Sequence, residues 1–253
     1  MKNCITVAMA LMMAVLLAGP AGAFELGAKG YYWMPSLGGD VRLDEGSILG
    51  TKIDFEDDLD IEDEDYAVGE VFCGIGRHHL SLSFYGADYE GSARLSQAIV
   101  FGGTTFNLDE TVEADLEYDV IDVMYRYDLL DLENVLAGFS IGVVGRVEYI
   151  DGTVEIKSDT LTEKEDFSAP IPMVGLNFHV GLLADWIEAR VLATGIVYSG
   201  NTLFDGMAEL SITPLPFVDF HGGYRMFKID ADYDDIELNY DTSGPYVALS
   251  VSF

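Results

Sequence analysis

The feature that most constrains this chain is an alternation of apolar and polar residues that recurs along most of its length. The C-terminal residues show it clearly. One set of positions holds Val247, Leu249, Val251 and Phe253, and the intervening set holds Tyr246, Ala248, Ser250 and Ser252. Because a β-strand points successive side chains to opposite faces, this spacing predicts a strand with one apolar face.

The apolar residues of the chain are spread by this alternation and are not gathered into long runs. Hydrophobic residues make up 49% of the chain, and the mean hydropathy is +0.21. After residue 23 the best candidate for a membrane helix is 167–184, but it contains Pro170, Pro172, Asn177 and His179, which make it a poor one. Apolar content without apolar runs is typical of a membrane protein that crosses the bilayer with strands.

Counting the alternating segments predicts an antiparallel transmembrane β-barrel of about ten strands. An even strand number returns both termini to the same side, as in bacterial single-chain barrels. The segment near 204–213 is the least regular, so eight strands remain an alternative. The expected strands lie near 24–35, 65–75, 77–89, 110–127, 134–150, 166–182, 186–198, 204–213, 217–230 and 244–253.

The predicted connections alternate in length. Short turns are expected near 75–77, 129–133, 183–185 and 214–216, and mostly longer loops at 36–64, 90–109, 151–165, 199–203 and 231–243. Short periplasmic turns and longer outer loops are the usual asymmetry of such barrels. Within the second long connection, Gly102-Gly103 resembles a two-residue hairpin turn.

One predicted strand changes phase. Between 112 and 120 the apolar residues occupy even positions, whereas from Ile121 to Tyr127 they occupy odd positions. A β-bulge inserts one extra residue into a strand and so exchanges its faces. We therefore expect a bulge at Val120-Ile121.

Residues 1–23 have the pattern of a cleaved secretory signal peptide. Lys2 is followed by an uncharged, mostly apolar segment, 5–19, and by Ala21-Gly22-Ala23 before Phe24. The apolar segment is short for a membrane helix, which needs roughly 20 residues, so a retained anchor is the weaker alternative. Export by the general secretory route is expected, with residues 24–253 forming the barrel. Cys4 leaves with the signal, so Cys73 has no intrachain disulfide partner.

The charge of the chain excludes some partners. Lysine and arginine number 13 against 44 acidic residues, which gives a net charge of −31. Such a chain will not hold nucleic acid by general electrostatics, although it could attract cations.

A soluble β-sandwich or lipocalin-like barrel would place the apolar face inside. The signal segment, the long alternating strands and the terminal Phe253 favour an apolar face in lipid.

With these features the chain resembles the bacterial outer-membrane β-barrel superfamily over its whole mature length. The resemblance implies the outer membrane of a double-membraned bacterium, with membrane lipid and lipopolysaccharide as neighbours. It also implies that the last strand, ending in Phe253, is recognised by the barrel-assembly machinery. The resemblance is unspecific for activity, because one fold can carry many functions.

Charged residues on the polar faces of the strands are the main candidate site. Arg146 and Glu148 lie two apart on one strand, as do Glu188 and Arg190, so each pair shares a face. The set forms either a structural ion-pair network that fills a narrow lumen or the lining of a path for small solutes. Its members are Lys29, Glu70, Asp122, Arg126, Arg146, Glu148, Glu188, Arg190, Glu209 and Arg225.

An acidic run, 54–65, lies in the first long connection. Hard cations favour clustered oxygen ligands, so Ca²⁺ or Mg²⁺ bridging to lipopolysaccharide is a hypothesis here. The run lacks the glycine of an EF-hand, and no firm metal site or cofactor is predicted from the sequence. The candidate residues are Asp54, Glu56, Asp57, Asp58, Asp60 and Glu62.

Aromatic residues and histidines have simple expected roles. Six tyrosines are expected to form outward girdles at the lipid boundary, namely Tyr32, Tyr118, Tyr125, Tyr127, Tyr149 and Tyr224, while Tyr31 and Trp33 pack the lumen. His78, His79, His179 and His221 fall near the predicted periplasmic end without a suitable partner motif. Outer-membrane proteases and lipid A deacylases place their chemistry at or near the outer rim, so no enzyme is expected.

The sequence thus favours a non-enzymatic barrel with a structural or interaction role, acidic surface loops and a charged, plugged lumen. A narrow channel for small solutes is the alternative, and a barrel-type membrane hydrolase is the third candidate.

Overall fold

The computed structural model describes residues 24–132, 138–182, 186–233 and 236–253. The expected signal peptide, the short turn at 183–185 and the predicted start of a strand at 134–137 lie outside these described residues. The short turn predicted at 129–133 is wrong over 129–132, which belong to the end of a strand that runs to Leu132, and residue 133 is not described. Within the described ranges, no helix is long and apolar enough to cross a membrane.

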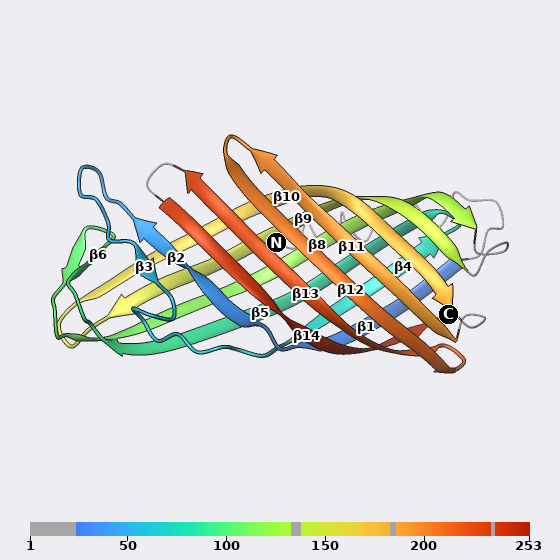
Figure 1. Ribbon diagram of the computed structural model, residues 1–253, viewed down its shortest axis with the longest axis horizontal. Coiled ribbons are helices and arrows are strands. Elements are labelled where there is room, and N and C mark those ends of the chain that lie inside the picture. Colours follow the sequence, from blue (N-terminus) through green and yellow to red (C-terminus); the bar gives the residue numbers. More distant parts are fainter. Residues whose placement is uncertain (1–23, 133–137, 183–185, 234–235) are drawn as a thin grey trace, which may run out of the picture.

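Ten antiparallel strands form a closed barrel (Figure 1). Each strand pairs with its neighbour along the chain, and β1 pairs with β14 from Gly27↔Ser252 to Trp33↔Tyr246, which closes the sheet. The ten-strand prediction is confirmed and the eight-strand alternative is wrong. The strands are β1 Phe24–Trp33, β4 Tyr66–Ile75, β5 His78–Arg94, β8 Thr111–Leu132, β9 Phe139–Lys157, β10 Thr162–Leu182, β11 Ile187–Tyr198, β12 Asn201–Leu215, β13 Val218–Tyr233 and β14 Ile236–Ser252.

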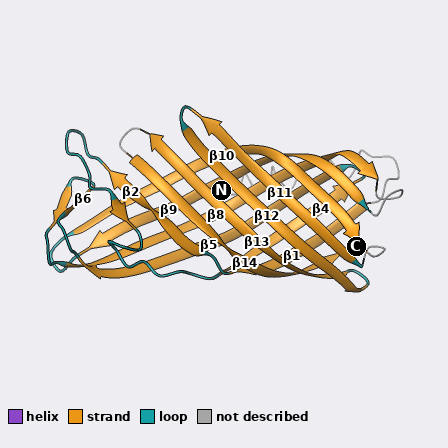
Figure 2. Ribbon diagram, in the orientation of Figure 1, coloured by secondary structure: helices purple, strands orange, loops and turns teal. Residues whose placement is uncertain are grey.

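Four shorter strands lie at one end of the barrel. β2 (Ser36–Leu43) pairs with the part of β14 that extends beyond β1, and β3 (Ile53–Asp54) pairs with β2. β6 (Ile99–Phe101) and β7 (Thr104–Phe106) form a separate hairpin. Gly102 and Gly103 turn that hairpin with positive φ angles of 52° and 74°, as the sequence predicted. Figure 2 shows the longer loops gathered at the end that carries these strands.

Around the inner half of the barrel, the apolar faces of the strands point outward. Phe84 and Leu249 are 54% and 45% exposed, whereas Ser81, Ser83 and Ser250 are buried inside. An apolar exterior with a polar interior is the arrangement expected of strands in lipid. The girdle prediction holds for Tyr32, Tyr125, Tyr149 and Tyr224, which are all exposed, and Tyr127 is half-buried.

The bulge predicted at Val120-Ile121 is wrong, because β8 passes this point in unbroken register with both neighbours. Val120 pairs with Tyr85 and Ile150, and Ile121 pairs with Phe84 and Tyr149. Residues at even positions point inward along the strand, so Val112 and Asp122 are both buried. The same positions therefore point inward along this part of the strand. What changes is the surroundings: nearer the loops the outer surface of the barrel meets water, and the inward residues are apolar.

The same change of surroundings explains two further errors. Tyr118 is buried inside the barrel, where its hydroxyl lies 2.7 Å from that of Tyr240, and it does not belong to the girdle. The long connections predicted at 151–165 and 231–243 are largely strand, because β9, β10, β13 and β14 continue beyond the lipid boundary, and β12 begins at Asn201 within the one predicted at 199–203. Backbone pairing persists there although the outward residues become polar, so the apolar pattern ended before the strands did.

A charge placed on the lipid face should impair membrane insertion. In Leu249→Arg an arginine replaces an exposed apolar residue in the outward-facing band, which costs roughly 2–4 kcal/mol near the bilayer midplane. We expect refolding into vesicles, followed by a heat-dependent gel shift, to show a loss of folded barrel. Ser92→Arg, on the water-facing outer part of β5, is the control and should insert normally. Normal insertion of both variants would mean that the lipid-facing side has been misassigned.

Candidate functional site

The outer half of the lumen encloses an apolar cavity of about 250 Å³. It forms where the inward residues of the strands become aromatic and aliphatic. Tyr66 and Tyr85 stack with ring centroids 5.4 Å apart, and Phe227 packs against Tyr240. Other residues around the cavity include Trp33, Val41, Phe55, Leu116, Ile150, Phe167, Ile229 and Leu238. We call this space the outer chamber.

The acidic run 54–65 forms part of the chamber wall. Its apolar members Phe55, Leu59 and Ile61 face the cavity, while the intervening carboxylates point away. Ile61 forms a β-bridge with Gly91, and the N–H of Glu62 donates to the Glu90 carbonyl at 3.0 Å. β4 begins only at Tyr66, so this segment covers the edge of β5 that β4 does not reach.

The six candidate cation ligands in this run do not converge on one point. The Asp54 carboxylate accepts backbone N–H bonds from Glu56 and Asp57, at 3.0 and 2.9 Å, and the Asp58 carboxylate accepts one from Asp54 at 3.0 Å. Asp60 and Glu62 are exposed. Among the described residues, no group of three or more His, Cys, Asp or Glu side chains is placed to hold a metal. Binding of Ca²⁺ or Mg²⁺ stays a prediction.

The water-facing exterior of the outer half is acidic. Glu90, Asp115 and Glu155 lie directly opposite one another across β5, β8 and β9. Burial, together with the neighbouring Glu155 and Asp88 carboxylates, raises the pKa of Asp115 above its ordinary value. Like charges opposite one another destabilise a sheet, and water screens them better than lipid would, so this part of the wall lies outside the bilayer.

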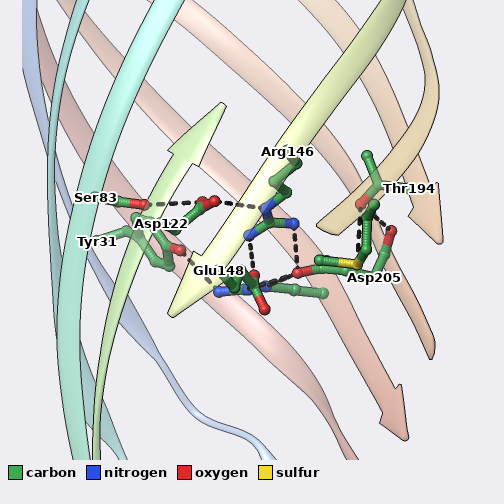
Figure 3. A network of polar contacts seen from close by, with 9 residues as sticks. Tyr31, Ser83, Asp122, Arg146, Glu148, Thr194 and Asp205 are labelled. Atoms are coloured by element: carbon green, nitrogen blue, oxygen red, sulfur yellow. Dashed lines mark hydrogen bonds and ion pairs between the residues drawn. The ribbon is translucent and has the colours of Figure 1, made fainter. Parts of the chain in front are cut away.

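Below the chamber, a buried cluster of charged side chains crosses the lumen (Figure 3). Arg146 contacts Asp122 at 2.9 Å, Asp205 at 2.6 Å and Glu148 at 2.5 Å. Arg225 contacts Asp205 at 2.6 Å and Glu148 at 3.4 Å. Arg225, Glu148 and Asp205 are each at most 1% exposed. We call this cluster the ionic floor.

Arg225 joins the ionic floor to the chamber above it. Its guanidinium donates to the Tyr31 hydroxyl at 3.1 Å and lies 4.7 Å from the centre of the Trp33 ring and 5.5 Å from that of Tyr85. Two guanidinium groups face three carboxylates in the floor, and each carboxylate contacts at least one guanidinium. Buried charges are costly unless paired in this way, and the pairing fills the bore with side chains.

The structure places all ten predicted lumen residues on inward faces, in two tiers. Asp122, Arg146, Glu148 and Arg225 belong to the floor. The others lie nearer the short turns: Lys29 contacts Glu209 and is opposite Glu70, Arg190 is opposite Glu209, Glu188 contacts His179, and Arg126 contacts Asp128. The terminal Phe253 exchanges backbone hydrogen bonds with Leu26 and stacks on Phe217.

Sequence reasoning missed Asp205, which contacts both arginines of the floor. It lies in the strand that the sequence marked least clearly, β12, where Gly206 and Ala208 weaken the apolar alternation. Its spacing of four residues from Glu209 placed it on the same inward face, and that signal could have identified it.

The histidines lie near the short turns, but three of them have carboxylate partners that the sequence did not indicate. His79 contacts Asp128 at 2.9 Å, His179 contacts Glu188 at 3.2 Å, and His221 contacts Glu209 at 3.0 Å. His221 also lies 2.9 Å from Ser250, so that Glu209, His221 and Ser250 form a series of contacts that resembles a hydrolase triad. The Ser250 hydroxyl also lies 3.2 Å from the Asp219 carboxylate, so His221 and Asp219 are both within hydrogen-bonding distance of it. These contacts pack the inner mouth.

Comparison with known proteins gives a fold and no closer relationship. No protein-family model matches the sequence, and no curated protein sequence matches it either. The outer membrane protease OmpT from Escherichia coli superposes with a TM-score of 0.59 over 91% of this chain and 98% of that chain, at 8% identity. The chain has the fold of a bacterial outer-membrane β-barrel. This fold agrees with the outer-membrane location expected from the sequence.

Two other barrels superpose less well. The translocator domain of the autotransporter NalP from Neisseria meningitidis gives a TM-score of 0.40 at 11% identity, covering 100% of this chain and 96% of that chain. Neisserial surface protein A gives 0.36 at 12% identity, covering 91% and 97%. At such identities the likeness concerns the fold, so the function of this barrel has to be argued from its own chamber and floor.

Removing one cation from the ionic floor should destabilise the barrel strongly. Arg225→Met leaves Asp205 and Glu148 with Arg146 alone, and breaking a buried ion pair in this way costs roughly 3–5 kcal/mol. Arg94→Met is the matched control, because Arg94 is an exposed residue whose contact with Asp109, at 3.3 Å, is worth at most about 1 kcal/mol. Urea unfolding of both variants in vesicles measures the free energies of unfolding. Equal losses would show that the floor carries no special stability.

Proposed function

We propose that this barrel is a non-conducting outer-membrane protein that binds an apolar ligand in its outer chamber. One observation carries the proposal: an apolar cavity of about 250 Å³ lies directly above a buried, internally paired ionic floor. The cavity lies at the end of the barrel that carries the longer loops. A ligand from the cell surface would therefore meet the chamber first and the floor last.

The size and lining of the chamber suit a small apolar ligand. An engineered cavity of roughly 150 Å³ lined by apolar side chains stays dry and binds benzene, so a single ring or a short acyl chain fits here. The Tyr66 hydroxyl is buried beside the cavity, where its neighbour is the Tyr89 side chain and it makes no hydrogen bond of good geometry to a described residue. An unmatched buried polar group costs free energy, so a ligand that carries one polar group near Tyr66 would bind more favourably.

The ionic floor is the reason to prefer a binding protein over a channel. A solute path needs a continuous water-filled passage. Arg146 and Arg225 instead donate their N–H groups to three carboxylates and to Tyr31. Opening such a path would separate buried ion pairs at a cost of several kcal/mol. The narrow channel remains the competing function, and conductance distinguishes the two.

Planar-bilayer recordings of the refolded mature chain should show no discrete conductance steps. The Arg146→Ala/Arg225→Ala variant removes both guanidinium groups of the floor, so it should conduct if a gel shift shows that it has folded. Steps in the unaltered barrel that change in Arg146→Ala or Arg190→Ala would contradict the proposal and favour the channel.

Ligand binding can be followed through Trp33, which borders the chamber. The sequence has two tryptophans, so Trp186→Phe leaves Trp33 as the sole reporter. Bromobenzene, whose bromine quenches nearby indole fluorescence, should quench it saturably. Ala114→Phe fills the cavity and should remove this saturable quenching. Ser92→Phe adds the same side chain outside the chamber and should leave it intact. Equal quenching in both variants would mean that bromobenzene does not occupy the chamber.

A further inference from the structure

The barrel wall has a seam between β10 and β11 in its outer half. β10 pairs with β9 without interruption from Thr162↔Lys157 to His179↔Ser140, but with β11 only from Val174↔Gly195 to Leu182↔Ile187. β11 ends at Tyr198 and turns into β12. Figure 1 shows the β11–β12 hairpin stopping while β9 and β10 continue toward the end that carries β6. One edge of 162–173 is therefore left without its neighbour.

Two prolines keep this seam from closing. Pro170 and Pro172 lie opposite Tyr149 and Val147 within the unbroken β9–β10 ladder. In an antiparallel sheet, residues two apart direct their backbone groups to the same neighbour, so both missing N–H groups belong to one edge. Because the ladder with β9 is intact, that edge is the one toward β11. Proline is tolerated in a sheet at such an edge, and it prevents further pairing there.

The outer chamber reaches the seam. Its wall includes Glu165, Asp166 and Phe167 of β10 and continues with Phe227 and Ile229 of β13. Among the described residues that line the cavity, none comes from β11 or β12, the two strands that lie between β10 and β13 in the sheet. At this level the cavity is thus bounded by strands that are not neighbours.

The lower end of the seam lies at the outer lipid–water boundary. On the lipid side, Val174 is 72% exposed, and Val197 at the hairpin tip is 75% exposed. Toward the loops, the next outward residues of β10 after Pro170 are Ser168 and Asp166. The exposed Tyr149 opposite Pro170 marks the change, as girdle aromatics do.

We propose that the ligand enters the chamber sideways through this seam, as an amphiphile from the outer leaflet with a single apolar chain and an uncharged or cationic head group. The chain would lie in the chamber, and the head group would stay at the rim beside Glu165 and Asp166. An anionic head group would be repelled by these carboxylates and by a protein whose net charge is −31. This inference rests on the proposed binding function and adds the route and the class of ligand.

A reversible cross-link tests the route. Continuing the β10–β11 register by two residues places 172 opposite 197, so Pro172→Cys/Val197→Cys can close the seam by a disulfide. The background carries Cys73→Ser and Trp186→Phe. Leu176→Cys/Ala193→Cys is the control, because these residues are already paired within the ladder. With a chain-brominated monoacylglycerol in the vesicle bilayer, oxidation should abolish Trp33 quenching in the seam pair and reduction should restore it. The control pair should quench in both states.

The remaining outcomes separate the route from the binding function. Undiminished quenching by the bilayer-borne probe in the oxidised seam pair would overturn sideways entry, while bromobenzene added from water would still report an intact chamber. If bromobenzene fails to quench Trp33 in the Trp186→Phe barrel, the binding function itself fails. Should the disulfide not form, a bulky maleimide on Val197→Cys must block the same quenching. A chain-brominated fatty acid should quench less than the monoacylglycerol or an alkyl ammonium, and equal quenching would overturn the head-group preference.

Discussion

The longer strands of this barrel, such as β5, β8, β9 and β10, pass from lipid into water, and the side of the wall that must be apolar changes at that boundary. In the bilayer, backbone groups must be paired and outward side chains must be apolar, so the closed sheet carries a polar interior. Beyond the bilayer the exterior is solvated, and the interior becomes an ordinary hydrophobic core. β8 shows both conditions in one strand: Val112 and Tyr118 are buried inside near the loops, and Asp122 is buried inside at the level of the floor.

The ionic floor lies where these two interiors meet. Arg225 contacts Asp205 and Glu148 on one side and the rings of Trp33 and Tyr85 on the other, so a single guanidinium belongs to both environments. Its planar group can pair with carboxylates and still stack on aromatic rings, which a lysine would do less well. In the function proposed here, the same side chains close the bore and supply the lower boundary of the chamber.

Several features that look like irregularities in the sequence serve this outer half. The acidic run 54–65 is a wall segment whose apolar residues Phe55, Leu59 and Ile61 face the cavity. Pro170 and Pro172, which spoil a helix in the sequence, end the pairing of β10 with β11. The Gly102-Gly103 turn was predictable because its backbone angles are local. The roles of the acidic run and of the prolines depend on strands that are distant in the sequence. These roles could therefore not be predicted from the sequence.

The sequence by itself determined the barrel class, the number of strands and the inward face of residues such as Arg146 and Glu148, because period-two alternation is a local property that a strand in lipid must satisfy. It also determined the acidic character of the outer surface. Tertiary structure decided what the alternation could not express: that Val120 and Ile121 lie in one unbroken ladder, that Tyr118 points inward, and that Asp205 completes the ionic floor. Each of these depends on which medium or which strand faces a residue across the closed barrel, and that is fixed only when the sheet closes.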